Sequence, residues 1–275
     1  MTKPSILISA ATASEAKPFK RAFGLSRHHQ TRSFSVYSNS LNTIHLIESG
    51  IGVANTACAI STLFHMTGMQ THACCLNIGI AGGLHHIGSP FQIHKIHDRA
   101  TNKRHYPALR PEIKIPSMSI ETHYAVCNTY PSHSLVDMES SGFYIAASRF
   151  VPNEQTGLLK IVSDNDAQSL KDITKNTVQE LIESQMPRIK QYVAAWEEHS
   201  LQEAKIHRQP PSYKQLLNQH HFSAYQQNAL LKLLNQWQAL NTHASLPQEI
   251  HRLSNSKAVL LQLKSWIKQT PVIWT

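Results

Sequence analysis

The segment ACCLNIGIAGG (residues 73–83) decides the fold, because it joins a buried strand to a run of glycines. Its first part, Ala73–Ile78, is almost wholly apolar and too short for a typical helix, so we predict a strand inside a sheet. The run Gly79–Gly83 is predicted to be a turn, where missing side chains let a ligand approach the backbone. This run lacks the Gly-x-Gly-x-x-Gly spacing, so a dinucleotide site is not expected.

Outward from this strand, apolar runs of strand length alternate with helical patterns over the first 200 residues or so. A hairpin is predicted at 39–42 and a long surface loop at 97–116, which is polar and contains three prolines. The alternation predicts an α/β fold, a three-layer α/β/α sandwich with a mixed central sheet. The other expected strands are residues 6–11, 33–38, 43–48, 91–96, 124–129 and 158–162, and the expected helices are 14–23, 53–66, 136–150 and 173–196.

A second unit is expected at the C-terminal end of the chain. Pro210-Pro211 marks a break, and leucines and tryptophans recur at helical spacing after it. Ser223 and Gln226 have the spacing of a capping box at the start of one such helix. We therefore divide the chain into an α/β domain, residues 1–200, and a small basic helical extension, residues 201–275.

The net charge of +9 is concentrated in that extension. Residues 1–203 hold 18 Lys and Arg against 16 Asp and Glu, whereas residues 204–275 hold 8 against Glu249 alone. A nucleic-acid or protein partner binding through residues 204–275 is one interpretation, and a solvated surface with few acids is the other. Both stay open at this point.

Several classes of protein are disfavoured by the composition. No apolar run approaches the roughly 20 residues that span a bilayer, and Ile6–Ile8 is too short for the core of a signal peptide. We therefore expect a cytoplasmic protein without a membrane contact. The four cysteines lack a Cys-x-x-Cys pair and are interpreted as core residues, and the histidine pairs lack zinc spacing, so neither a metal nor a cofactor is expected.

Three acidic residues follow buried strands, at the positions where open α/β sheets bind ligands. Glu15 follows the first strand, Glu139 lies in the helix expected from Val136, and Asp164 follows the strand Leu158–Val162. The structural alternatives are that Glu15 is a solvated first-turn residue and that Asp164 caps the next helix. A buried Glu139 would need a partner, which favours a functional interpretation.

Five segments together resemble the purine nucleosidase/nucleoside phosphorylase superfamily, which includes the methylthioadenosine/S-adenosylhomocysteine nucleosidases and the futalosine hydrolases. Each segment is weak alone, but their order and spacing are fairly specific. The resemblance covers about residues 5–197 and not the extension. The segments are ILISAATASE (6–15), SGIG (49–52), NIGIAGG (77–83), VDMES (136–140) and KIVSD (160–164).

The resemblance implies cleavage of the bond between a purine and ribose. In this family an acid at the position of Asp164 protonates the base, and one at the position of Glu15 activates water. The residues at Met138 and Glu139 hold the ribose. The glycine segments add Ile51, Gly79, Ile80 and Gly82 to the expected substrate site. An oxocarbenium-like transition state requires two carboxyls in different environments, one protonated and one ionised.

The sequence departs from the family pattern at the phosphate-binding positions. Asn77 and Ile80 stand where phosphorylases commonly place arginine and serine, and Lys160 replaces the usual arginine before the final acid. A lysine is a point charge and not a bidentate clamp. The stretch between Gly83 and Glu139 is short, so Tyr130 and Tyr106 are the candidates for the aromatic that stacks on the base.

Three functions remain as hypotheses. The first is a nucleosidase that hydrolyses the N-glycosidic bond of a purine nucleoside or thionucleoside. The second is a phosphorylase that uses Lys160 for phosphate. The third is a nucleoside-binding protein without turnover, with a basic extension that binds nucleic acid or protein. The family often forms dimers, and the apolar run Val53–Met66 would suit a homodimer interface.

Overall fold

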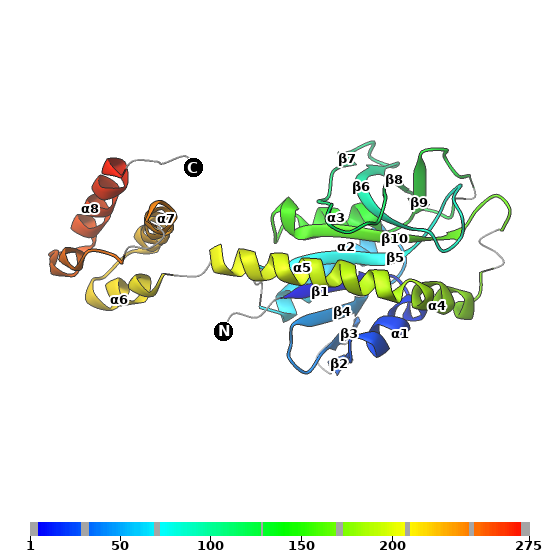
Figure 1. Cartoon of the computed structure of the whole chain (residues 1–275), viewed down its shortest axis with the longest axis horizontal. Helices are drawn as coiled ribbons and strands as arrows, with labels where there is room; N and C mark the ends of the chain where they lie inside the picture. The colour runs from blue at the N-terminus through cyan, green and yellow to red at the C-terminus, as the bar shows by residue number, and fades with distance from the viewer. Residues whose placement is uncertain are drawn as a thin grey trace. The chain divides into compact units, whose positions relative to one another are not determined.

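The computed structural model describes residues 5–28, 33–68, 72–127, 129–168, 173–206, 210–241 and 245–270. The chain divides into two compact units, Met1–Ala204 and Lys205–Thr275. The elements of both units are labelled in Figure 1.

The first unit is built on one mixed sheet, with strands in the order β10-β6-β8-β9-β5-β1-β4-β3-β2. β5 also pairs with β10, so the strands β5, β10, β6, β8 and β9 form a closed ring at one end of the sheet. β7 pairs with β6. The strands are β1 Ile6–Ala10, β2 Ser26–His28, β3 Ser35–Ser38, β4 Ile44–Glu48, β5 Cys74–Gly82, β6 Pro90–Asp98, β7 Arg104–His105, β8 Ser117–Thr122, β9 Ser134–Asp137 and β10 Thr156–Asp164.

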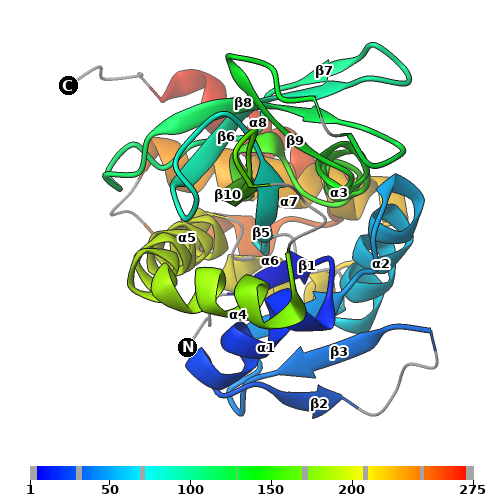
Figure 2. The same cartoon turned by 90° about the vertical axis from the view of Figure 1, so that its right-hand side faces the viewer.

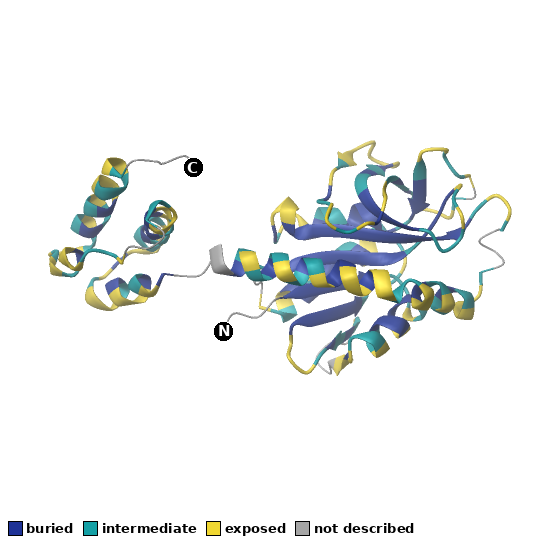
Figure 3. Ribbon diagram, in the orientation of Figure 1, coloured by how far each residue is buried: buried dark blue, intermediate teal, exposed yellow. Residues whose placement is uncertain are grey.

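The central strands β1, β5 and β10 run parallel to one another and are buried along nearly their whole length. Figure 3 shows this buried centre in dark blue. Strands buried on both faces need apolar side chains on both, which explains the continuous apolar runs in these segments. Because the three strands are parallel, their carboxyl ends meet at one edge of the sheet.

Helices pack against the sheet on two sides (Figure 2). Leu63, Phe64 and Phe143 of α2 and α3 share one core with sheet residues. Phe19, Ile182 and Trp196 of α1, α4 and α5 share the other. The helices are α1 Ala13–Ala22, α2 Val53–Met66, α3 Ser140–Ala147, α4 Lys175–Ser184 and α5 Met186–Ile206. The mixed α/β architecture with a central mixed sheet agrees with the sequence-based expectation.

Several predicted elements are wrong in detail. The glycines at 79 and 82 belong to β5 and do not form a turn after it. The predicted helix 136–150 begins only at Ser140, because residues 134–137 pair with β8 and β5 as β9. The predicted helix 173–196 is two helices, α4 and α5, which are separated at Gln185.

The region between β6 and β9 also differs from the prediction. The loop predicted at 97–116 contains β7, and β8 follows it. No strand occurs at 124–127 or 129–130, and Asn128 lies outside the described residues. Of the cysteines, Cys74 and Cys75 are buried as expected, but Cys58 is exposed and Cys127 is partly exposed.

The second unit has a small apolar core of its own. Its helices are α6 Pro211–Gln219, α7 Ala224–Leu240 and α8 Ser256–Gln269, with a 3-10 helix at Gln248–Arg252. The Ser223 hydroxyl accepts a hydrogen bond from the Gln226 backbone, and the Gln226 side chain accepts one from the Ser223 backbone. This is the predicted capping box. None of the helices in the described part of the chain has the length and apolar character needed to cross a bilayer.

Candidate active site

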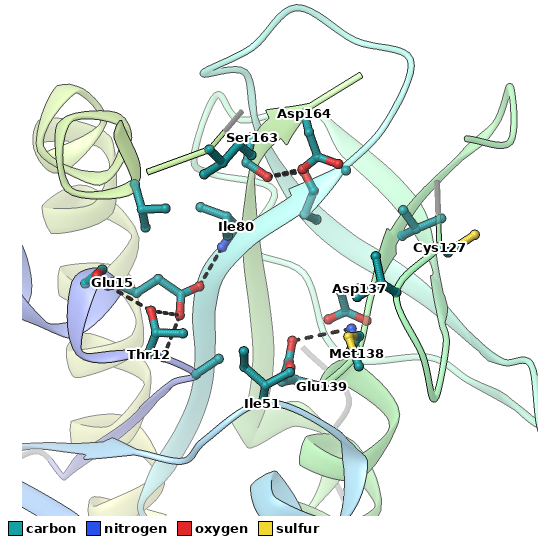
Figure 4. Close-up of a pocket in the computed structure, with 18 of the residues that line it drawn as sticks. Thr12, Glu15, Ile51, Ile80, Cys127, Asp137, Met138, Glu139, Ser163 and Asp164 are labelled. Atoms are coloured by element: carbon teal, nitrogen blue, oxygen red, sulfur yellow. Dashed lines mark hydrogen bonds between the residues drawn. The ribbon is translucent and has the colours of Figure 1, made fainter. Parts of the chain in front are cut away.

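A cavity of about 410 Å³ opens at the carboxyl ends of β1, β5, β9 and β10. Figure 4 shows side chains from these strand ends pointing into one space. Ile51, which precedes α2, the segment 126–127 and residues at the start of α4 complete the wall. The lining residues are Ala11, Thr12, Ser14, Glu15, Ile51, Ile80, Ala81, Gly82, Val126, Cys127, Val136, Asp137, Met138, Glu139, Ser163, Asp164, Ile173, Thr174, Lys175 and Val178.

Glu15 is held in the cavity wall by three hydrogen-bond donors. Its Oε2 accepts from the backbone nitrogen of Thr12 at 2.7 Å and from the Thr12 hydroxyl at 3.0 Å, and its Oε1 accepts from the backbone nitrogen of Ile80 at 3.0 Å. A side chain at position 79 would displace this carboxylate, because a Cβ there would lie 2.5 Å from Glu15 Oε1. The solvated first-turn interpretation is therefore wrong, since Glu15 is only 3% exposed.

Glu139 lies at the junction between β9 and α3. Its Oε1 accepts a hydrogen bond of 2.8 Å from the backbone nitrogen of Gly52, which has a φ of 100°. Burial and the nearby charge of Asp137 raise the pKa of Glu139 to about 7, although Lys160 and the Gly52 hydrogen bond oppose the shift. Glu139 therefore changes its charge near neutral pH, which is unusual for a carboxyl.

Lys160 forms a buried ion pair with Asp137, with 2.9 Å between Nζ and Oδ2. Asp137 also accepts hydrogen bonds from the Ser140 backbone nitrogen and hydroxyl and from the Thr122 hydroxyl. Burial by itself lowers the pKa of the Lys160 amine, but the charges of Asp137 and Glu139 outweigh it and raise this pKa. Lys160 does not line the cavity, so its predicted contact with substrate or phosphate is not supported.

Asp164 is the last residue of β10 and is 3% exposed. The hydroxyl of Ser163 donates to its Oδ1, and the hydroxyl of Tyr130 donates to its Oδ2 at 2.5 Å. Among the helices of the described residues, Asp164 caps none, because the N-cap of α4 is Thr174. The acid sits in the strand itself and its side chain reaches the cavity (Figure 4).

The aromatic residues proposed to stack on a base do not form the cavity wall. Tyr130 donates a hydrogen bond to Asp164 but does not line the cavity. Tyr106 does not line it either, and its side chain is 57% exposed. Val126 and Cys127 line the wall instead, on the segment that follows β8. Burial and the charge of Asp164 raise the pKa of Tyr130, so its hydroxyl stays neutral and donates.

The other predicted residues divide into two groups. Ile51, Ile80, Gly82 and Met138 line the cavity. Gly79 does not, and it acts by leaving room for Glu15. Asp137 was not predicted as a site residue, although a signal for it is present: a lysine in a buried strand requires an acidic partner, and VDMES offers one beside Glu139.

The lining of the cavity is rich in carboxyl groups. Four of the described lining residues are carboxylic acids, Glu15, Asp137, Glu139 and Asp164. Lys175 is the one lysine or arginine among these described residues, and it is exposed. No group of three or more His, Cys, Asp or Glu side chains within the described ranges could hold a metal ion. The cavity therefore holds several carboxyl groups that can donate or accept protons, as general acid and base catalysis requires.

Comparison with solved structures places this fold beside known nucleosidases. The apo 5′-methylthioadenosine nucleosidase of Arabidopsis thaliana matches with a TM-score of 0.60 and 15% identity, over 71% of this chain and 97% of that one. The native futalosine hydrolase of Helicobacter pylori matches with a TM-score of 0.57 and 13% identity, over 70% and 97%.

The 5′-methylthioadenosine/S-adenosylhomocysteine nucleosidase of Helicobacter pylori, solved with butyl-thio-DADMe-Immucillin-A, matches with a TM-score of 0.58 and 13% identity, over 70% of this chain and 99% of that one. No family model and no curated protein matches the sequence. At these identities the likeness shows the fold alone: the chain has the fold of these nucleosidases and of the futalosine hydrolase.

Proposed function

We propose that this protein hydrolyses the N-glycosidic bond of a purine nucleoside or thionucleoside. The observation that carries the proposal is the placement of three buried carboxyls around one cavity, each with different partners. Glu15 has three donors, Asp164 has two hydroxyls, and Glu139 has a pKa of about 7. Carboxyls in contrasting environments are what an acid and a base in one site require.

In the proposed reaction, Asp164 donates a proton to a ring nitrogen of the leaving base. The electron pair of the breaking C–N bond moves to the base, and positive charge develops on the sugar. Glu15 accepts a proton from water as the water oxygen bonds to the anomeric carbon. Glu139 accepts hydrogen bonds from the ribose hydroxyls, and Met138 packs against the sugar.

Hydrolysis is favoured over phosphorolysis by the charges in the cavity. Phosphate would enter a space lined by four carboxylic acids. The buried cation Lys160 is already paired with Asp137. Asn77 is turned toward the carbonyl of Ser9, with its amide nitrogen 3.4 Å from that oxygen. Water needs no cationic clamp, whereas a phosphate dianion does.

The names of the structural neighbours support the same reaction class. They are nucleosidases and a futalosine hydrolase, and they are covered by this chain almost to their full length. At 13–15% identity they do not select a base or a 5′ substituent for this chain. The substrate class in the proposal is therefore the purine nucleosides as a group.

The test is release of free base from a panel of purine nucleosides, including methylthioadenosine, adenosylhomocysteine, inosine and futalosine, each with and without phosphate. We expect release without phosphate dependence. Asp164→Asn should lower kcat by about 10²–10⁴-fold, the usual contribution of an acid catalyst. Asp166→Asn is the matched control, because Asp166 is exposed two residues away and does not line the cavity.

If the wild-type protein releases no base from any nucleoside of the panel, the proposal is overturned. Phosphate-dependent release of a sugar phosphate would replace it with phosphorolysis. An Asp164→Asn protein as active as the wild type would refute the role of this acid while leaving hydrolysis in place.

For the C-terminal unit we propose a polyanionic partner, on one observation. Lys257, Lys264 and Lys268 are exposed at spacings of seven and four residues, so they share a face of α8. Electrophoretic mobility shift with single-stranded and double-stranded nucleic acids would test it, with binding that weakens steeply with salt as the expected result. Absence of a shift at low salt would contradict the proposal.

A further inference from the structure

Tyr130 and Asp164 come together from distant parts of the chain. The tyrosine precedes β9, the acid ends β10, and the tyrosine oxygen lies 2.5 Å from Asp164 Oδ2. The other carboxylate oxygen accepts from the hydroxyl of Ser163 (Figure 4). Both oxygens of the proposed acid are therefore held by neutral hydroxyl donors.

The backbone at position 82 makes room for this pair. A Cβ on Gly82 would lie 2.5 Å from Tyr130 Cε1 and 2.6 Å from Asp164 Oδ2. Contacts this short do not occur for real side chains, so no residue with a Cβ fits at 82 unless the tyrosine or the acid moves. β5 thus contributes a glycine at the point where both side chains cross it.

Tyr130 reaches Asp164 from outside the cavity. Asp164 and Ser163 line the cavity, whereas Tyr130 does not. A carboxylate has about four lone-pair positions on its two oxygens. The two hydroxyls leave further positions free, so the tyrosine can stay bonded while a substrate meets the acid from the cavity side.

We propose that Tyr130 is a positioning residue for Asp164 in the nucleosidase reaction. This inference rests on the proposed function. When Asp164 passes its proton to the leaving base, it becomes a carboxylate, and the hydroxyl hydrogens of Tyr130 and Ser163 then stabilise the new charge. Donors fixed in advance toward a developing charge stabilise the transition state more than the ground state. Tyr130 also limits the rotation of the carboxyl, which keeps it aimed at the base.

The test is Tyr130→Phe, which removes one hydroxyl and keeps the ring. A hydrogen bond to a charged group contributes enough for an expected fall in kcat of about 10- to 100-fold. KM should change little, because the ring does not line the cavity. Tyr124→Phe is a matched control: the Tyr124 hydroxyl also donates to an aspartate, Oδ2 of Asp98 at 3.4 Å, away from the cavity.

The Asp164→Asn background separates positioning from a general structural effect. If Tyr130 acts through Asp164, then Tyr130→Phe should lower the residual rate of Asp164→Asn far less than it lowers the wild-type rate. An equal loss in both backgrounds would overturn the inference, and so would wild-type kcat in Tyr130→Phe. Thermal melting of each variant checks that the fold is kept.

The two proposals fail in different ways. Active wild-type protein with a fully active Tyr130→Phe variant refutes the positioning role alone and leaves hydrolysis intact. Wild-type protein that releases no base from any nucleoside refutes hydrolysis and, with it, the positioning role.

Discussion

Replacing Lys160 by methionine removes the amine that pairs with Asp137 but keeps most of the side-chain volume. Both side chains are at most 2% exposed, so water cannot replace the amine. Loss of one partner from a buried ion pair costs about 3–5 kcal/mol. Asp137 keeps three donors, from Ser140 and Thr122. We therefore expect the low end of that range, about 3 kcal/mol, or a fall in Tm of roughly 6–12 °C for a unit of this size.

Differential scanning calorimetry of the full chain would measure the loss. Arg21→Met is the control, because the Arg21–Glu183 pair has the same 2.9 Å separation but side chains that are 69% and 44% exposed. Exposed pairs contribute only about 0–1 kcal/mol. The reasoning is refuted if Lys160→Met loses no more stability than Arg21→Met. The double variant Asp137→Asn/Lys160→Met should recover part of the loss, because no uncompensated charge remains.

Three further predictions concern the cavity. Gly79→Ala places a methyl group 2.5 Å from Glu15 Oε1 and should lower kcat by about 100-fold in the base-release assay, the effect of a displacement of about 1 Å; an unchanged kcat would contradict this. KM for the nucleoside should fall as pH rises through about 7, because the ionised Glu139 carboxylate accepts hydrogen bonds from both ribose hydroxyls. The Glu139→Gln variant should show no such change of KM with pH. Alkylation of Cys127, followed by mass spectrometry in a Cys58→Ser chain, should slow when nucleoside fills the cavity; equal rates with and without nucleoside would count against binding there.

Local pattern was sufficient for the buried parallel strands and for the acids near their ends. Glu15 and Asp164 could be found because an apolar run followed by a polar residue marks the carboxyl end of a strand, and such ends meet at one edge of the sheet. Met138 and Glu139 were found by motif. The structure places all four of these residues around one cavity.

Strands defined by their partners could not be predicted in this way. β8, with the sequence SMSIET, and the four-residue β9 carry little apolar signal of their own. They are strands because of their partners: β8 pairs with β6, and β9 pairs along its length with β8 and at Val136 with Gly82 of β5. The closed ring of strands depends on the same pairings and was not foreseen.

The side-chain partners of residues on neighbouring strands could not be predicted from the sequence either. Lys160 was predicted to face the substrate, but strand register turns it toward Asp137. Tyr130 was considered for its ring, whereas its hydroxyl is the group that reaches the site. In both cases the residue was correctly singled out and its direction was not, because direction follows from which strands are neighbours.

The position of β10 in the sheet affects how the protein is made. β10 is the last strand of the described residues in sequence, yet it lies between β5 and β6. At a synthesis rate of about 5–20 residues per second, the ribosome needs roughly 4–16 s after β5 to deliver residues up to Asp164. Until then the backbone groups of β5 and, once it is made, of β6 that pair with β10 lack that partner, and unpaired strand edges favour aggregation of a growing chain. Asp164, the proposed acid, lies on β10, the strand that pairs with these backbone groups. A nascent chain therefore completes its site only when β10 completes the sheet.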